Sequence, residues 1–507
     1  MFIRELKNRS GSVSVQIISK HRGKYRVIKS IGSGTTPEEI ATLKEIARFY
    51  LIKLEGQASL FTSKDDSYIE GYLSTFSNNQ IRVIGPELIF GKVYDGIGFS
   101  VIKEEMFRHL VITRLVNPGS KLKTIDYLFR YQGINVSKDS VYRFLDKLHK
   151  THKEKVEQIA FSHTLKVHHG NIGIVFYDMT TLHFEASDED DLRKTGFSKV
   201  GRHQDPQIYL GLLVTSTGFP IGYDIYEGNI YEGHTLIPFI HKLERKFNLS
   251  RPVVVADAGL LNSDNIESLE SEGYSYILGA RIKNESNRIK QEIFSFKLED
   301  GQNAVIKKSD NQRLVVSYTS KRAKKDESNR NRGLQRLERN LKSGRLTKSN
   351  INKRGYNKYL RLTGEIKIEI DYDKFKQDSM WDGLKGYLTN TSLGPDEIIE
   401  NYGNLFQIER AFRISKTDLR IRPIYHRIQD RIDAHICISF TAYTIYKEVE
   451  RILKLGGCSL SAKRAAELTN NMYQLCYTLP ETKQRKNLIL QMDDEQQLLY
   501  STLGRFY

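Results

Sequence analysis

Two short apolar runs, each ending at an aspartate, constrain the fold of this chain more than any other feature. Residues 172–177 (IGIVFY) precede Asp178, and residues 252–256 (PVVVA) precede Asp257. Short continuous apolar runs rich in β-branched side chains are typical of strands buried on both faces, as in sheets covered by helices on each side. The sequence therefore predicts an α/β sheet in the middle of the chain.

The order of the segments around these runs narrows the fold further. Three strands joined by turns are expected first, followed by helix, strand, helix and strand. These segments cover residues 172–177, 207–215, 219–226, 234–247, 252–256, 262–272 and 274–280. Such an order is that of the ribonuclease-H-like fold. The predicted fold class is therefore α/β, with a ribonuclease-H-like core.

Positive charge is concentrated in one part of the chain. The net charge is +17, and residues 321–361 hold 15 basic and 3 acidic side chains, a surplus of 12. A basic surplus supports salt-dependent association with phosphate backbones, although it also serves solubility. Its concentration into a patch favours a nucleic-acid partner.

Other sequence features bear on the cellular location. No run of about 18 apolar residues occurs that would span a membrane. The N-terminus lacks the apolar stretch of a secretory signal. Cys437, Cys458 and Cys476 have the spacing of neither a disulfide framework nor a metal site. We therefore expect a cytoplasmic protein with no membrane partner.

A chain of 507 residues is too long for one ordinary core, and six regions are expected. They comprise a β-hairpin plus helix for DNA binding, a helical region with a candidate helix-turn-helix, the first part of the core, a basic β-rich insertion, the second part of the core and a helical tail. Their bounds are residues 1–60, 84–166, 170–280, 281–385, 386–455 and 456–507.

Asp178 and Asp257 are candidates for chemistry because the carboxyl ends of strands border the functional crevice of an α/β sheet. Two carboxylates at that edge can share a hard divalent cation, which prefers oxygen ligands. A third carboxylate would complete a two-metal site for in-line phosphoryl transfer. One aspartate at a strand end more often caps a turn, but two in this strand order favour the metal site.

Spacing suggests the third carboxylate. Tyr402, Glu409 and Lys416 recur every seven residues, which keeps them on one face of a continuous α-helix. Such a row can meet a metal ion and the phosphates beside it. The alternative is an exposed helix face with pairs such as Glu409 and Arg413.

These segments resemble the insertion-sequence transposases of the DDE class, in the cut-and-paste branch whose third motif is Tyr-x2-Arg-x3-Glu-x6-Lys. The residues at the spacings of that motif are Tyr402, Leu405, Glu409 and Lys416. Residues 178–181 (DMTT) and 256–259 (ADAG) look like the first two motifs, and residues 419–435 resemble the stretch that comes after the third motif in a subgroup. The resemblance covers about residues 90–455.

The resemblance implies a DNA transposase that binds terminal inverted repeats and catalyses metal-dependent cleavage and strand transfer on double-stranded DNA. Asp178, Asp257 and Glu409 would be both the catalytic residues and the ligands of two Mg²⁺ ions, with Mn²⁺ as a substitute. A homodimer is expected in the synaptic complex. The resemblance also implies a β-rich insertion between the second and third carboxylates.

One position departs from the family motif, since Leu405 replaces an arginine thought to hold a phosphate near the cleaved strand. Either another arginine takes over or this subgroup handles the cut end differently. Trp381 is expected either to stack on a flipped base or to pack within the fold. The candidates for DNA contact are Tyr402, Lys416, Arg413, Arg410, Arg420, Lys324, Lys325, Arg332 and Trp381.

Two other functions stay open at this point. One is a catalytically inactive, transposase-derived DNA-binding protein, which would not require all three carboxylates. The other is a stand-alone metal-dependent nuclease, which would not require the elaborate N-terminal regions.

Overall fold

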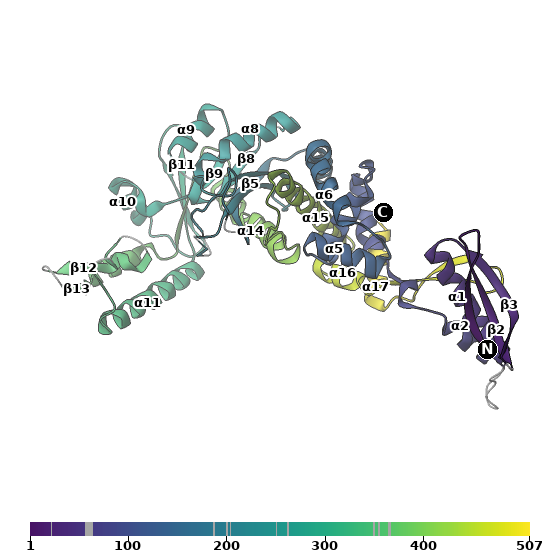
Figure 1. The fold of residues 1–507 in the computed structure, drawn as a ribbon. Helices are drawn as coiled ribbons and strands as arrows, with labels where there is room; N and C mark the ends of the chain where they lie inside the picture. The colour runs from purple at the N-terminus through teal and green to yellow at the C-terminus, as the bar shows by residue number, and fades with distance from the viewer. Residues whose placement is uncertain are drawn as a thin grey trace. The chain divides into compact units, whose positions relative to one another are not determined.

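The computed structural model describes residues 1–21, 23–55, 64–185, 188–198, 201–202, 204–249, 251–260, 263–347, 350–352, 355–363 and 367–507. The chain forms two compact units (Figure 1). The first comprises Met1–Lys92, Gly119–Ser140 and Ile452–Tyr507, and the second comprises Val93–Pro118 and Val141–Arg451. Among the described helices, none combines the length and apolar character needed to cross a membrane.

The N-terminal part of the first unit is a three-stranded antiparallel sheet packed on a helix. The predicted hairpin corresponds to β2 (Val13–His21) and β3 (Lys24–Gly34), and the predicted helix to α1 (Pro37–Glu55). A further strand, β1 (Phe2–Lys7), pairs with β2 and was not predicted. Val15 and Ile17 of β2 and Ala47 of α1 are buried between sheet and helix. The alternating apolar side chains of β2 therefore provide the core of this module.

The rest of the first unit joins segments that are far apart in the sequence. Three strands form a small sheet in the order β16-β15-β4, and helices α2, α5, α16 and α17 accompany it. The bounds are α2 (Lys64–Leu73), β4 (Ile81–Val83), α5 (Lys121–Tyr127), α16 (Ala462–Thr469), β15 (Tyr473–Thr478), β16 (Arg485–Ile489) and α17 (Asp494–Gly504). The expectation of a wholly helical C-terminal tail is therefore wrong, because β15 finds its partner β4 nearly 400 residues earlier in the chain.

Helices dominate residues 84–166, as the sequence predicts. They are α3 (Lys92–Ile97), α4 (Glu105–Val116), α5, α6 (Lys138–Lys147) and α7 (Lys153–Val167). In α4, Phe107 and every residue from Leu110 to Val116 are buried, so the second half of this helix lies inside the fold. A helix-turn-helix role for part of this region stays a prediction.

An eight-stranded mixed sheet is the centre of the second unit, with the order β10-β11-β14-β9-β8-β5-β6-β7. β5, β8 and β9 are parallel, and β6 and β7 follow β5 in antiparallel pairing. All five strands expected between residues 170 and 280 are present. They are β5 (Ile174–His183), β6 (Gln207–Thr215), β7 (Pro220–Glu227), β8 (Val253–Ala256) and β9 (Tyr276–Ala280).

β5 is longer than the sequence predicts. It continues past Asp178 to His183, because the second half of the strand pairs with β6 from Asp178↔Leu212 to His183↔Gln207. Asp178 therefore lies within a strand, whereas Asp257 directly follows the end of β8.

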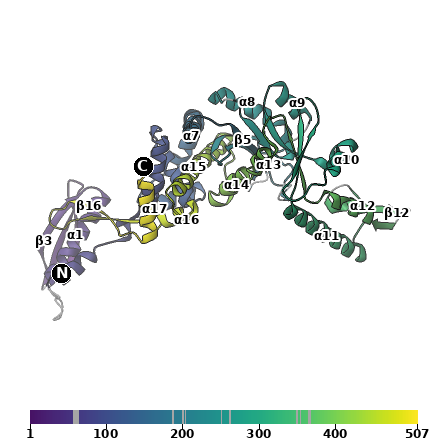
Figure 2. The same ribbon diagram turned by 180° about the vertical axis from the view of Figure 1, so that it is seen from behind.

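The segment between β9 and the end of β14 is a mixed α/β insertion rather than a β-rich one (Figures 1 and 2). Three of its strands extend the main sheet beyond β9, and a 23-residue helix, α11, carries the start of the basic patch. Its elements are α10 (Asn287–Ser295), β10 (Asn303–Lys307), β11 (Arg313–Tyr318), α11 (Ser320–Lys342), β12 (Leu360–Thr363), β13 (Lys367–Ile370), α12 (Tyr372–Asp378) and β14 (Leu384–Thr389).

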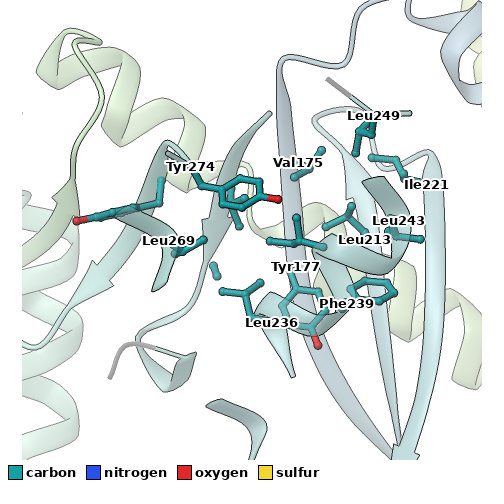
Figure 3. Packing of buried hydrophobic residues seen from close by; sticks show 14 of the residues in the cluster. Val175, Tyr177, Leu213, Ile221, Leu236, Phe239, Leu243, Leu249, Leu269 and Tyr274 are labelled. Atoms are coloured by element: carbon teal, nitrogen blue, oxygen red, sulfur yellow. The ribbon is translucent and has the colours of Figure 1, made fainter. Parts of the chain in front are cut away.

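Helices cover both faces of the sheet. On one face, α8 (Leu236–Phe247) and α9 (Ser263–Ser271) bury their apolar sides against the strands (Figure 3). Val175, Tyr177 and Leu213 of the sheet meet Phe239 and Leu243 of α8 there. On the other face, Tyr223 of β7 packs against Phe440 of α15 (Gln429–Leu455), with ring centres 4.8 Å apart. Burial on both sides explains the continuous apolar runs of β5 and β8.

The packing of α8 gives a test of this core. We expect Leu243→Ala to lower the free energy of unfolding by about 2–5 kcal/mol, because it leaves a cavity beneath the helix. Arg245→Ala, an exposed position on the same helix, should change it by less than about 0.5 kcal/mol. Urea unfolding of the full chain, followed by circular dichroism, measures both. Equal effects of the two substitutions would contradict the packing described.

Candidate active site

The carboxyl edge of the parallel strands brings two predicted aspartates together. In the pairing of β5 with β8, Tyr177 lies opposite Ala256, the last pair, so Asp178, within β5, and Asp257, just after β8, each come one residue beyond it. Adjacent strands are about 4.8 Å apart. Asp178 is half-buried and Asp257 is exposed. The strand-end placement expected from the apolar runs therefore holds for Asp257, whereas Asp178 lies inside β5.

Local hydrogen bonds orient both carboxylates. The Met179 amide donates to Oδ1 of Asp178 at 2.7 Å, and the Ala258 amide donates to Oδ1 of Asp257 at 2.7 Å. The Tyr402 hydroxyl donates to the same Asp257 oxygen at 3.0 Å. Burial raises the pKa of Tyr402, and the charge of Asp257 raises it further, so the phenol stays a neutral donor. Tyr402 therefore positions a carboxylate, a role that the sequence did not assign to it.

Gly279 of β9 makes this contact possible. A Cβ atom at Gly279 would overlap the Tyr402 hydroxyl and lie 3.1 Å from the Ala258 amide nitrogen. The absence of a side chain lets the phenol cross β9 and reach Asp257.

The continuous helix expected for Tyr402, Glu409 and Lys416 is not present. Tyr402 belongs to α13 (Pro395–Gly403), Glu409 to α14 (Phe406–Arg413) and Lys416 to a π-helical turn over Ile414–Asp418. Between α13 and α14 the backbone bonds are of the i→i+3 kind, from the Leu405 amide to Tyr402 and from the Gln407 amide to Asn404. Gly403, a poor helix former, lies at this break. The prediction of one straight row is therefore wrong.

Separate turns nevertheless direct these side chains to the same edge of the sheet. The Lys416 ammonium group donates to the Thr180 hydroxyl, two residues beyond Asp178. The charges of Asp257 and Glu409 both raise the pKa of Tyr402 and both act on Lys385, so the two carboxylates lie within electrostatic range of the same side chains. Within the described part of the chain, no three His, Cys, Asp or Glu residues form a group that could hold a metal ion.

Lys385 of β14 lies at this edge and was missed by the sequence analysis. Its ammonium group is 4.2 Å from the ring centre of Tyr402 and 5.4 Å from that of Tyr387. Burial and the charge of Arg322 lower the pKa of Lys385, while Asp257 and Glu409 oppose that shift. Nothing in the local sequence distinguishes it, because its position depends on the pairing of β14 with β9.

The arginines considered as replacements at the Leu405 position differ in their surroundings. Leu405 itself is buried. Arg410 forms an ion pair with Glu450 at 2.5 Å, while Arg413 is exposed. Arg420 is exposed, with a backbone φ of 45°.

The remaining candidates for DNA contact lie in the insertion. Lys324, Lys325 and Arg332 are exposed on α11. Trp381 packs against Phe294, with ring centres 4.5 Å apart, and borders the small core of the insertion. Of the two roles considered for Trp381, base stacking and packing, the structure shows the packing contact.

The contact at Gly279 can be tested by a double-mutant cycle. We expect Gly279→Ala to lower the free energy of unfolding by about 1–3 kcal/mol, because the new methyl group overlaps the Tyr402 hydroxyl. Tyr402→Phe removes that oxygen and should recover much of the loss in the double variant. Gly173→Ala, where an added methyl group meets no atom within 4 Å, is the matched control. Strictly additive losses in the double variant would contradict the overlap.

Comparisons with known proteins identify the family of the chain. Residues 170–445, more than half of the chain, match the family described as the transposase DDE domain. The matched segment contains Asp178, Asp257 and Glu409. No curated protein sequence gives a significant match.

Several solved structures are similar to parts of the chain. A piggyBac transposase synaptic complex with hairpin DNA shares 11% identity, with 76% of each chain covered and a TM-score of 0.38. The Mos1 mariner paired-end complex with Mn shares 15% identity over 28% of this chain and 50% of that one, with a TM-score of 0.14. The Mos1 transposase paired-end complex with left transposon end shares 11% identity over 46% and 72%, with a TM-score of 0.16. By the match over residues 170–445, the chain belongs to the family of transposases with a DDE domain.

Proposed function

We propose that this transposase is active: it binds the terminal inverted repeats of its element and catalyses metal-dependent cleavage and strand transfer on double-stranded DNA. The observation that carries this proposal is the pairing of Tyr177 with Ala256, which places Asp178 and Asp257 one residue further along the neighbouring strands β5 and β8. The strand order β7-β6-β5-β8-β9, with the first three antiparallel and the last three parallel, supports a ribonuclease-H-like core. The insertion then separates β9 from α14.

The residues at this edge suit a hard divalent cation. Carboxylate oxygens are the ligands that Mg²⁺ and Mn²⁺ prefer, and Asp178 and Asp257 supply them from adjacent strands. Asp178, Asp257 and Glu409 would hold two such ions, which activate the attacking oxygen and stabilise the leaving one in phosphoryl transfer. The proposal requires the exposed side chain of Glu409 to approach the two aspartates.

The proposed reaction has two steps. In cleavage, the oxygen of a water molecule forms a bond to phosphorus and loses a proton to solvent, while the bond from phosphorus to the 3′ oxygen breaks and that oxygen takes up a proton from solvent. The products are a 3′-hydroxyl and a 5′-phosphate. In joining, the 3′-hydroxyl attacks a phosphodiester of the target, and the displaced target oxygen leaves with a proton. Tyr402 keeps Asp257 oriented throughout, through its hydrogen bond.

The basic surface of α11 is a proposed DNA-binding element. Lys321, Lys325, Arg332, Arg336 and Arg339 recur at intervals of three, four or seven residues and are all exposed, so they form one stripe along the helix. The opposite side of α11 buries Leu337 in a small core. A helix of 23 residues is about 35 Å long, enough to follow a duplex for roughly one turn. The functional complex would be a homodimer holding two element ends.

The carboxylates provide the main test. In a plasmid excision assay on the gene with its flanking DNA, we expect Asp178→Ala, Asp257→Ala and Glu409→Gln each to lower the rate by more than about 100-fold while DNA binding survives. Glu400→Gln, at an exposed position of α13, should cut like the wild type. Binding without cleavage in Mg²⁺ or Mn²⁺ would favour the inactive DNA-binding alternative. Cleavage without joining would favour a nuclease.

A second test addresses α11. We expect the triple variant Lys324→Ala, Lys325→Ala and Arg332→Ala to bind duplex DNA more weakly, and to lose up to about three units from the slope of log K against log salt. Lys374→Ala with Lys376→Ala, two exposed lysines of α12, is the control. The slope is measured by fluorescence anisotropy over a range of salt concentrations. An unchanged slope would exclude α11 from the interface.

A further inference from the structure

The insertion delivers a lysine to the edge of the sheet that carries the aspartates. β14 runs antiparallel to β9, with Gly386 opposite Ala280, the last residue of β9. Lys385 is therefore level with the carboxyl end of β9, on the edge from which Asp257 follows β8. The same pairing pattern brings the end of β11 there, since Ser317 lies opposite Lys385.

Several contacts fix the start of β14 in this position. The Thr319 amide, just before α11, donates to the Gly383 carbonyl at 3.1 Å, and the Gly383 amide donates to Asp326 at 3.3 Å. Arg330 bonds to Asp382 at 2.6 Å. Gly383 has a φ of 86°, and a side chain there would overlap Tyr318 and Ala323. The backbone just before Lys385 is therefore held against α11.

The Lys385 ammonium group lies over aromatic faces rather than on a carboxylate. It is 4.2 Å from the ring centre of Tyr402, the residue whose hydroxyl bonds to Asp257. No carboxylate of the described residues forms an ion pair with it. A half-buried cation without an anionic partner is costly, and burial accordingly lowers its pKa. An anion arriving at this edge would meet a positive charge that is already in place.

We propose that Lys385 is a catalytic residue whose ammonium group binds a non-bridging oxygen of the phosphate being cleaved. This proposal rests on the proposed function. The ring of Tyr402 lies under the Lys385 ammonium group, and the hydroxyl of the same Tyr402 bonds to Asp257, so the cation and this carboxylate can contact the same phosphate. Negative charge on the non-bridging oxygens must be neutralised in phosphoryl transfer, and a preorganised cation does this without reorganisation. Buried Leu405 offers no such charge.

The alternative is that Lys385 only packs on Tyr402 and Tyr387. A packing role depends on the apolar stem, which methionine reproduces, whereas a phosphate-binding role depends on the charge, which arginine retains. Lys385→Met and Lys385→Arg therefore separate the two roles. Lys376→Ala, an exposed lysine of α12, is the control for general loss of positive charge.

The experiment measures single-turnover cleavage in Mg²⁺ on a duplex containing the cut site mapped with the wild type, and duplex affinity in Ca²⁺. We expect Lys385→Met to cut about 100-fold more slowly with affinity changed less than about threefold, and Lys385→Arg to recover at least tenfold of that loss. Thermal unfolding verifies that each variant is folded.

A neutral substrate then tests contact with the phosphate. In a duplex with a methylphosphonate at the cut site, the ammonium has no charge to neutralise, so the further loss caused by Lys385→Met should shrink to less than about tenfold. An undiminished loss on the methylphosphonate, or cleavage by Lys385→Met at the wild-type rate, would overturn the role of Lys385 while leaving the proposed function intact. Absence of cleavage by the wild type would overturn both.

Discussion

The parallel pairing of β5 with β8 is the constraint on which the rest of the site depends. Tyr177 lies opposite Ala256, and the next residue after each of them is an aspartate. The pairing is stable because helices bury both faces of these strands. The pairing of β5 with β8 therefore determines both the packing of the core and the placement of the carboxylates.

The insertion is part of the site because its strands continue the sheet. β14 pairs with β9 and β11 pairs with β14, so residues of the insertion, far along the chain from Asp257, arrive at the same edge. Lys385 and Arg322 reach the surroundings of Asp257 and Glu409 in this way. α11, which begins two residues after β11, extends positive charge away from that edge. The strands of the insertion therefore connect the basic surface of α11 to the edge of the sheet that carries the carboxylates.

The sequence predicted elements correctly where burial gives the apolar residues a regular spacing. It failed where the structure depends on pairing between distant strands or on a local break in a helix. The five strands of the core and helix α8 follow from apolar runs and 3.6-residue periodicity. β15 is only half-buried and pairs with β4, so its own residues carry a weak signal. The break after Gly403 was missed because a spacing of seven residues between Tyr402, Glu409 and Lys416 looks the same in the sequence whether or not the helix is continuous. Lys385 had no local signal at all.

The sequence by itself determined the α/β class, the two aspartates that follow apolar runs and the excess of positive charge in residues 321–361, because each depends on local pattern or composition. Only the tertiary structure decided which side chains meet those aspartates. Tyr402 reaches Asp257 across Gly279, and Lys385 lies over the Tyr402 ring, through contacts between strands and turns far apart in the chain. Such contacts depend on register and close packing, which a linear pattern of residues does not encode.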